Sequence, residues 1–173
     1  MSMAYYFIAK FDTETQRRMS DYYDCLRMEG LIGQQTEGVP YHFTLGEHDK
    51  GADEAALTLQ LEKICAKTTR VEFCMGHMGL FGLRVLFLSP CMNFELLQLR
   101  QSFFPGSGCG AHPWAAHATV LLDAAENIQR AIPLLANRFE PFCARIDSVA
   151  LWEFFPARLI KECYLQGEPS SIG

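Results

Sequence analysis

Apolar residues recur along this chain with two different periods, and stretches of the two kinds alternate. Apolar residues at every second position predict β-strands, because successive side chains of a strand point to opposite faces. Glycine, proline and polar turn residues bound seven such stretches. We expect strands at residues 5–11, 40–46, 71–75, 84–89, 114–122, 143–155 and 158–165, with the third extending toward residue 81.

Between these strands, the apolar residues fall at helical spacing. We expect helices at 13–30, 53–65, 93–103 and 123–139. A capping signal precedes each helix: Thr13 with Gln16, Asp53, Asn93, and Asp123 with Glu126. Pro133 lies inside the last helix and is expected to kink it.

The order of the elements repeats, since each half of the chain has a strand, a helix, a strand, a helix and a strand. The length of 173 residues is that of a single domain. We therefore predict one α+β domain over residues 1–173, made of two pseudo-symmetric lobes at approximately 1–82 and 83–173, between which the chain ends can cross over. A pseudo-two-fold axis would bring the middle strands of the two halves to one central groove.

Composition narrows the classes of function. A net charge of −5 argues against a surface that binds long nucleic acids, although it allows a small basic pocket. No apolar run reaches the roughly 18 residues that a membrane-spanning helix needs, and the first residues do not resemble a signal peptide. The seven cysteines occur singly, without a C-x-x-C motif. They fit buried thiols in a reducing compartment, so we expect a cytoplasmic protein.

One short pattern, His-apolar-Thr-apolar, occurs twice. It reads His-Phe-Thr-Leu at 42–45 and His-Ala-Thr-Val at 117–120. On a strand, His42 and Thr44 share one face while their apolar neighbours enter the core, and His117 and Thr119 do the same. Two imidazoles, each beside a hydroxyl, suit acid–base chemistry at a phosphate ester. One imidazole accepts a proton from the attacking group, the other protonates the leaving oxygen, and the hydroxyls donate to the phosphate.

The paired motifs, the chain length and the duplicated order resemble the two-histidine (2H) phosphoesterase superfamily. That group includes RNA 2′,3′-cyclic phosphodiesterases and 2′-5′ RNA ligase-like proteins. The resemblance implies an α+β fold in which two lobes with antiparallel sheets surround a central groove, with helices outside. It also implies His42 and His117 as the acid–base pair, in either order, and Thr44 and Thr119 as phosphate-binding residues.

The resulting hypothesis is a metal-independent phosphoesterase without a cofactor. Its substrates would be 2′,3′-cyclic phosphates or 2′-5′ phosphodiester bonds of nucleotides or RNA ends, and 2′-5′ ligation would be the reverse reaction. The alternative is a module of the same fold that binds a nucleotide or a phosphorylated metabolite without turnover. We expect no membrane partner and no long duplex nucleic acid.

Other residues are weaker candidates for the site. Arg84 is either a phosphate ligand or an ordinary exposed or carboxylate-paired arginine. Tyr41 and Trp114 flank the motifs and could stack a base, but strand parity points both away from the histidine face, toward the core. Cys109 and His112, near His117, suggest zinc, yet no second pair of ligands accompanies them, and we expect no metal.

Overall fold

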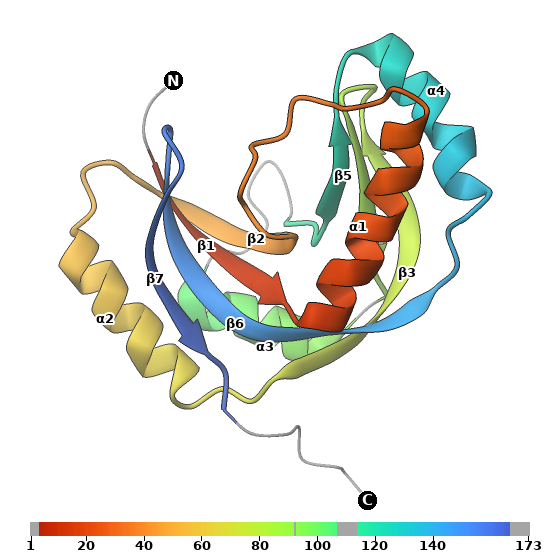
Figure 1. Ribbon diagram of the computed structural model, residues 1–173. Coiled ribbons are helices and arrows are strands. Elements are labelled where there is room, and N and C mark those ends of the chain that lie inside the picture. The colour runs from red at the N-terminus through yellow and green to blue at the C-terminus, as the bar shows by residue number, and fades with distance from the viewer. Residues whose placement is uncertain (1–3, 92, 107–113, 167–173) are drawn as a thin grey trace, which may run out of the picture.

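A computed structural model of the chain describes residues 4–91, 93–106 and 114–166. In these ranges the elements follow the predicted order (Figure 1). They are β1 (Ala4–Phe11), α1 (Thr13–Met28), β2 (His42–Asp49), α2 (Glu54–Cys65), β3 (Val71–Phe81), β4 (Val85–Pro90), α3 (Phe94–Phe103), β5 (Ala118–Leu122), α4 (Ala125–Ala136), β6 (Phe142–Phe154) and β7 (Arg158–Tyr164). None of the helices in this part of the chain is both long and apolar enough to cross a membrane.

The predicted α+β class with antiparallel strands is confirmed. The strand order is β2-β1-β6-β3-β4-β5, β7 pairs with β6, and every pairing of named strands is antiparallel. The sheets of the two halves are continuous because the long strand β6 pairs with β3 over Phe142–Ile146 and with β1 over Ile146–Phe154. The sheet curves strongly, and Figure 1 shows β2 and β5 near each other across its inner side.

The arrangement has the expected pseudo-two-fold symmetry. Exchanging β1 with β4, β2 with β5, and β3 with β6 gives the same strand order, read from the opposite edge of the sheet. The helices obey the same exchange, since α1 contacts α4 and β5 while α3 contacts α2 and β2. Each half therefore packs one helix onto elements of the other half. The lobe boundaries at 82 and 83 stay a prediction.

Two helix caps differ from the sequence-based expectation. Asp12, not Thr13, caps α1, because its carboxylate accepts a hydrogen bond from the Thr15 N–H at 2.9 Å. The last helix begins after Ala124 without a side-chain cap, and the Asp123 carboxylate accepts a hydrogen bond from the adjacent Ala124 N–H at 2.7 Å. The predicted caps Asp53 and Asn93 are confirmed by hydrogen bonds to backbone N–H groups of the first turn.

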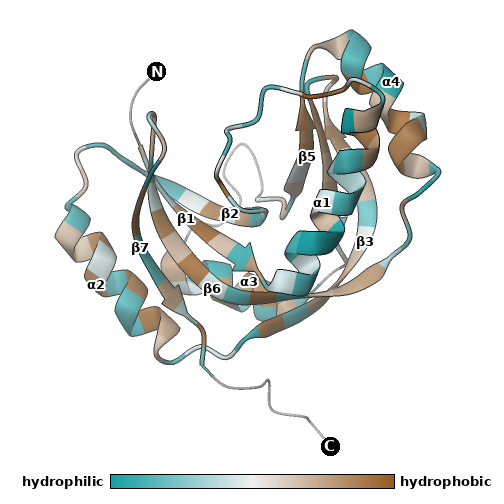
Figure 2. Cartoon of the chain, in the orientation of Figure 1, coloured by the Kyte–Doolittle hydropathy of each residue, from teal (hydrophilic) through white to brown (hydrophobic). Residues whose placement is uncertain are grey.

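The alternation along the motif strands is as predicted. Phe43 and Leu45 on β2 are fully buried, as are Ala118 and Val120 at the start of β5. Figure 2 shows brown, apolar segments in both strands. The polar motif residues between them are only half-buried and lie on the opposite face of the strand. Burial of the apolar side chains thus fixes the direction in which each histidine and threonine points.

Candidate active site

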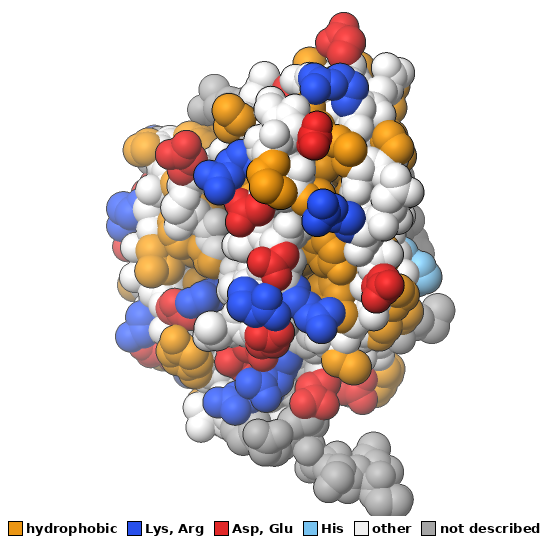
Figure 3. Space-filling model, turned by 45° about the vertical axis from the view of Figure 1, so that its right-hand side comes forward, with side chains coloured by type: hydrophobic (Ala, Val, Ile, Leu, Met, Phe, Trp, Pro, Cys, Tyr) orange, Lys and Arg blue, Asp and Glu red, His pale blue; other side chains and the backbone are white. Residues whose placement is uncertain are grey.

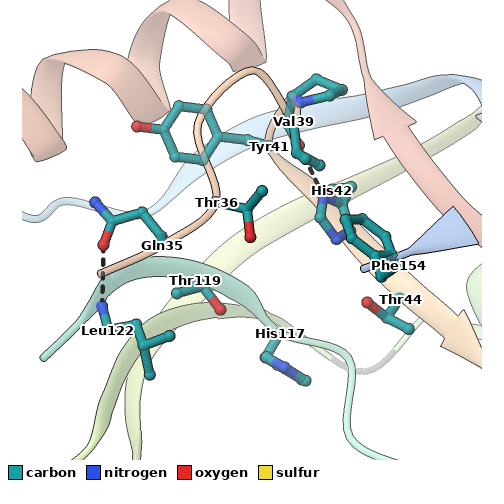
Figure 4. Close-up of a pocket in the computed structure, with 11 residues that line it drawn as sticks. Gln35, Thr36, Val39, Tyr41, His42, Thr44, His117, Thr119, Leu122 and Phe154 are labelled. Atoms are coloured by element: carbon teal, nitrogen blue, oxygen red, sulfur yellow. Dashed lines mark hydrogen bonds between the residues drawn. The ribbon is translucent and has the colours of Figure 1, made fainter. Parts of the chain in front are cut away.

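Both motifs line one pocket of about 210 Å³. His42 and Thr44 come from β2, Thr119 from β5, and His117 from the residue just before β5. Figure 4 shows the two histidine–threonine pairs on opposite walls of this pocket. The expected convergence of positions that are 75 residues apart in the sequence is therefore present in the structure.

Each of the two imidazole rings is oriented by a hydrogen bond to the backbone carbonyl two residues before it. Nδ1 of His42 lies 2.7 Å from the carbonyl oxygen of Pro40, and Nδ1 of His117 lies 2.8 Å from that of Ala115. A carbonyl oxygen only accepts, so Nδ1 carries the proton in both rings. This leaves Nε2 of each ring for proton exchange with a bound molecule.

The surroundings favour the neutral form of His42. Burial away from water lowers the pKa of this imidazole, and the nearby His117 lowers it further, while the hydrogen bond to Pro40 opposes the change. A neutral ring with its proton on Nδ1 has an unprotonated Nε2. His42 is therefore suited to accept a proton at neutral pH.

Two phenylalanines pack against His117. The Phe81 ring meets the imidazole edge-on, with centroids 4.6 Å apart, and the Phe87 centroid lies at 5.3 Å. Both come from the β3–β4 hairpin, so this hairpin forms a wall behind the second motif. Sequence reasoning gave neither residue a role at the site, because aromatic residues in apolar strands are usually core.

A loop ahead of β2 also reaches the pocket, which the sequence did not reveal. Gln35 and Thr36 line it, and Figure 4 shows the Thr36 hydroxyl directed inward. The Gln34 N–H donates to the Leu122 carbonyl at 2.6 Å, and the Leu122 N–H donates to Gln35 Oε1 at 3.3 Å. This loop of the first half is thus tied to the end of β5. Gly33, with a φ of 79°, is a sequence signal for a turn in this loop.

The three weaker candidates, Tyr41, Trp114 and Arg84, lie in three different surroundings. Tyr41 lines the pocket, but its ring points toward α1, and burial raises its pKa to about 12. Trp114 borders a neighbouring cavity and donates from Nε1 to the Thr44 carbonyl at 2.8 Å, so it joins the two motif segments. Arg84 is exposed in the turn between β3 and β4 and does not line the pocket, so the structure does not support it as a phosphate ligand.

The pocket wall carries no formal charge of its own. Among the described residues that line it, none is Asp, Glu, Lys or Arg, and its polar groups are imidazoles, hydroxyls and a carboxamide. In the described ranges, no three His, Cys, Asp or Glu side chains are grouped as a metal site, and Cys109 and His112 lie outside those ranges. A protonated imidazole would therefore be the positive charge that attracts an anion.

The fold and the site define a class: a pseudo-symmetric α+β protein that presents one His-x-Thr pair from each half to a shared pocket. A family model for the 2′-5′ RNA ligase superfamily matches residues 16–154, and the chain belongs to this superfamily. None of the curated proteins compared with the chain matches it.

Solved structures share the fold at low sequence identity. Escherichia coli LigT, complexed with 3′-AMP, is 17% identical with a TM-score of 0.63, covering 96% of this chain and 100% of LigT. The protein TT0787 of Thermus thermophilus is 14% identical with a TM-score of 0.64, at 96% and 100% coverage. A structure described as a phosphoesterase is 16% identical with a TM-score of 0.62, at 95% and 99% coverage.

Proposed function

We propose that this protein is a metal-independent phosphoesterase that cleaves 2′,3′-cyclic phosphates or 2′-5′ phosphodiester bonds of nucleotides or RNA ends. The observation that carries the proposal is the meeting of both His-x-Thr pairs in one pocket. The alignment of both Nε2 atoms by backbone carbonyls supports it, because proton transfer requires a fixed tautomer and ring orientation.

For a cyclic phosphate, the lowered pKa of His42 supports a role for His42 as the base and for His117 as the acid. Neutral His42 accepts a proton from the water that attacks phosphorus, and His117 in its protonated form donates a proton to the departing ribose oxygen. One P–O bond forms and one breaks, and the product is a phosphomonoester. Ligation would reverse a different step, the cleavage of a 2′-5′ bond by the neighbouring 3′ hydroxyl. A 5′ hydroxyl would attack the cyclic phosphate, the 3′ oxygen would leave, and the two histidines would exchange the roles they have in that cleavage. Thr44 and Thr119 donate to the non-bridging oxygens as charge develops there.

The charge of the pocket favours a phosphodiester over a phosphomonoester as the substrate. A cyclic phosphate carries one negative charge, which one imidazolium balances, whereas the product can carry two. Long nucleic acids are disfavoured by the net charge of −5. The face in Figure 3 agrees, since acidic and basic side chains are interspersed there and the α1 arginines Arg17 and Arg27 pair with acidic neighbours.

The ligands of the relatives point in the same direction. Structures of E. coli LigT are described with 3′-AMP, ATP, NADP⁺ and phosphate. A nucleotide or an RNA end is therefore the ligand class that we propose for this chain. The six described cysteines are all free thiols, which fits a reducing compartment such as the cytoplasm.

The test is to incubate the protein, in the presence of a chelator, with each 2′,3′-cyclic nucleotide and with a 2′-5′-linked dinucleotide. We expect His42→Ala and His117→Ala each to lose about 10²-fold or more in kcat/KM. His77→Ala, at an exposed histidine of β3, is the matched control and retains the activity. If either motif variant keeps most of the rate, the two-histidine mechanism is wrong. Tight nucleotide binding without product would instead support a non-catalytic binding module.

A further inference from the structure

Three cysteines form a row across adjacent strands, and none of them lines the phosphate pocket. Cys74 on β3 lies directly opposite Cys143 on β6. On the other side of β3, the Cys91 N–H donates to the Cys74 carbonyl at 2.9 Å, one step beyond the Met75–Pro90 pair. Directly opposed residues project to the same face of a sheet, so the three thiols lie side by side.

The thiols of this row are more accessible to solvent than the buried thiols of Cys25 and Cys65. Phe73 and Met75 enter the core, and Cys74 between them therefore points to the outer face of the sheet. Cys143 is exposed, and Cys74 and Cys91 are half-buried. The sequence-based expectation of buried thiols is met by Cys25 and Cys65 but not by this row.

A histidine accompanies Cys91. A bulge in the β3–β4 pairing at Gly76 brings His77 next to this cysteine, with Nε2 3.7 Å from Sγ. A β-carbon at position 76 would collide with Cys91 Sγ, so glycine provides the space that the thiol occupies. The result is a thiol with a base on one side and a second thiol on the other.

We propose that Cys91 and Cys74 form a peroxide-reactive thiol pair, in which His77 activates Cys91 and oxidation joins the two cysteines in a disulfide. His77 takes the Cys91 proton, and the thiolate attacks a hydroperoxide. The O–O bond breaks, the departing oxygen takes the proton back from His77 and leaves as an alcohol or water, and Cys91 becomes a sulfenic acid. Cys74 then attacks the Cys91 sulfur, and water leaves as the S–S bond forms. Two thiols lose two electrons, and the hydroperoxide is reduced.

The geometry and the local environment separate the two roles. The backbone hydrogen bond from Cys91 to Cys74 places the two residues opposite each other, on β3 and directly after the antiparallel strand β4. Residues paired in this way typically have Cα atoms about 5.5 Å apart, which lies within the range of about 4.4–6.8 Å that a disulfide spans. Burial raises the pKa of Cys74, and its neighbours Cys91 and Cys143 raise it further. The raised pKa favours the thiol form of Cys74, whereas Cys91 has a base beside it.

The test treats the reduced protein with one equivalent of hydrogen peroxide, blocks remaining thiols, and maps peptides without reduction. We expect a Cys74–Cys91 link that dithiothreitol reverses, and we expect it also in Cys143→Ser. In Cys74→Ser, Cys91 should persist as a sulfenic acid that dimedone traps. A Cys74–Cys143 link in its place would overturn the proposal.

A second measurement examines His77 separately. Iodoacetamide should alkylate Cys91 several-fold more slowly in His77→Gln than in the wild type at pH 7. The alkylation rate of Cys143 in the same samples is the internal control and should not change. Equal Cys91 alkylation rates in both proteins would refute the role of His77. Both readouts follow thiol chemistry alone, so they are independent of phosphoesterase activity.

Discussion

The indole N–H of Trp114 donates a hydrogen bond to the backbone carbonyl of Thr44, at 2.8 Å, across 70 positions of sequence. Trp114 lies just ahead of the second motif and Thr44 is part of the first. The guanidinium of Arg100 lies over the same indole, 5.1 Å from its centroid. This contact joins the two motif segments, and Trp114 borders the neighbouring cavity rather than the motif pocket, so the contact can set their spacing.

Trp114→Phe should therefore weaken both stability and catalysis. We expect the free energy of unfolding to fall by about 1 kcal/mol or more from the lost hydrogen bond, and kcat to fall more than KM rises. Trp152→Phe is the matched control for stability, because Trp152 Nε1 has no hydrogen-bond partner among the described residues. Denaturant titrations and kinetics measure both effects. Equal losses in the two variants would show that the Thr44 contact contributes nothing specific.

Gln16 on α1 should fix the entry to the first motif. Its side chain donates to the Tyr41 carbonyl at 2.7 Å and accepts from the Tyr41 N–H at 2.9 Å. Gln16→Ala leaves both backbone groups without this partner, which typically costs about 1–3 kcal/mol. Because Tyr41 directly precedes His42, kcat should fall as well. Gln101→Ala, at an exposed position of α3, is the control and should change neither quantity.

The motif and the element order could be predicted from the sequence because they depend on local periodicity. Burial of Phe43 and Leu45 on one face of β2 determines where His42 and Thr44 point. The duplicated order of strands and helices similarly predicted the symmetry that brings His117 opposite His42. Local periodicity therefore predicts the positions of the motif side chains and of no other side chains in the site.

The rest of the site depends on contacts that no local pattern encodes. Gln35 reaches the pocket because it binds Leu122, 87 positions away. The cap at Asp12 was missed because Gln16, which completes the predicted capping box, binds Tyr41 instead. Arg84 was considered as a phosphate ligand, but the tight turn between β3 and β4 exposes it.

The lowered pKa of His42 predicts a pH effect on stability. The unfolded chain protonates this histidine near the ordinary value of about 6.5, whereas the folded protein does so only at lower pH. Below about pH 6.5 the unfolded state therefore binds more protons, and stability falls as the pH decreases. Denaturant titrations from pH 7.5 to 5 should show a larger loss for the wild type than for His42→Gln. The same loss in both would contradict the assigned shift.

The same shift should appear in catalysis. If neutral His42 is the proton acceptor, its protonation abolishes activity at low pH. The acidic limb of kcat/KM for a 2′,3′-cyclic nucleotide should therefore lie below about pH 6.5, since that profile reports the free enzyme. An acidic limb above this value would instead assign the base to another group.

The loop that carries Thr36 offers a last test, at two glycines with nearly equal backbone angles. Gly30 has a φ of 80° and Gly33 a φ of 79°, so alanine is strained at both positions. A β-carbon at Gly33 would also collide with Gln35 Oε1 and approach Leu121 Cδ1 at 2.8 Å, whereas at Gly30 nothing lies within 4 Å. Gly30→Ala should therefore cost stability of about 1 kcal/mol with little effect on activity. Gly33→Ala should cost more and should also raise KM, because displacement of Gln35 removes one of the two hydrogen bonds that tie the loop to β5 and shifts the neighbouring Thr36. If the two variants have the same KM, the loop takes no part in substrate binding.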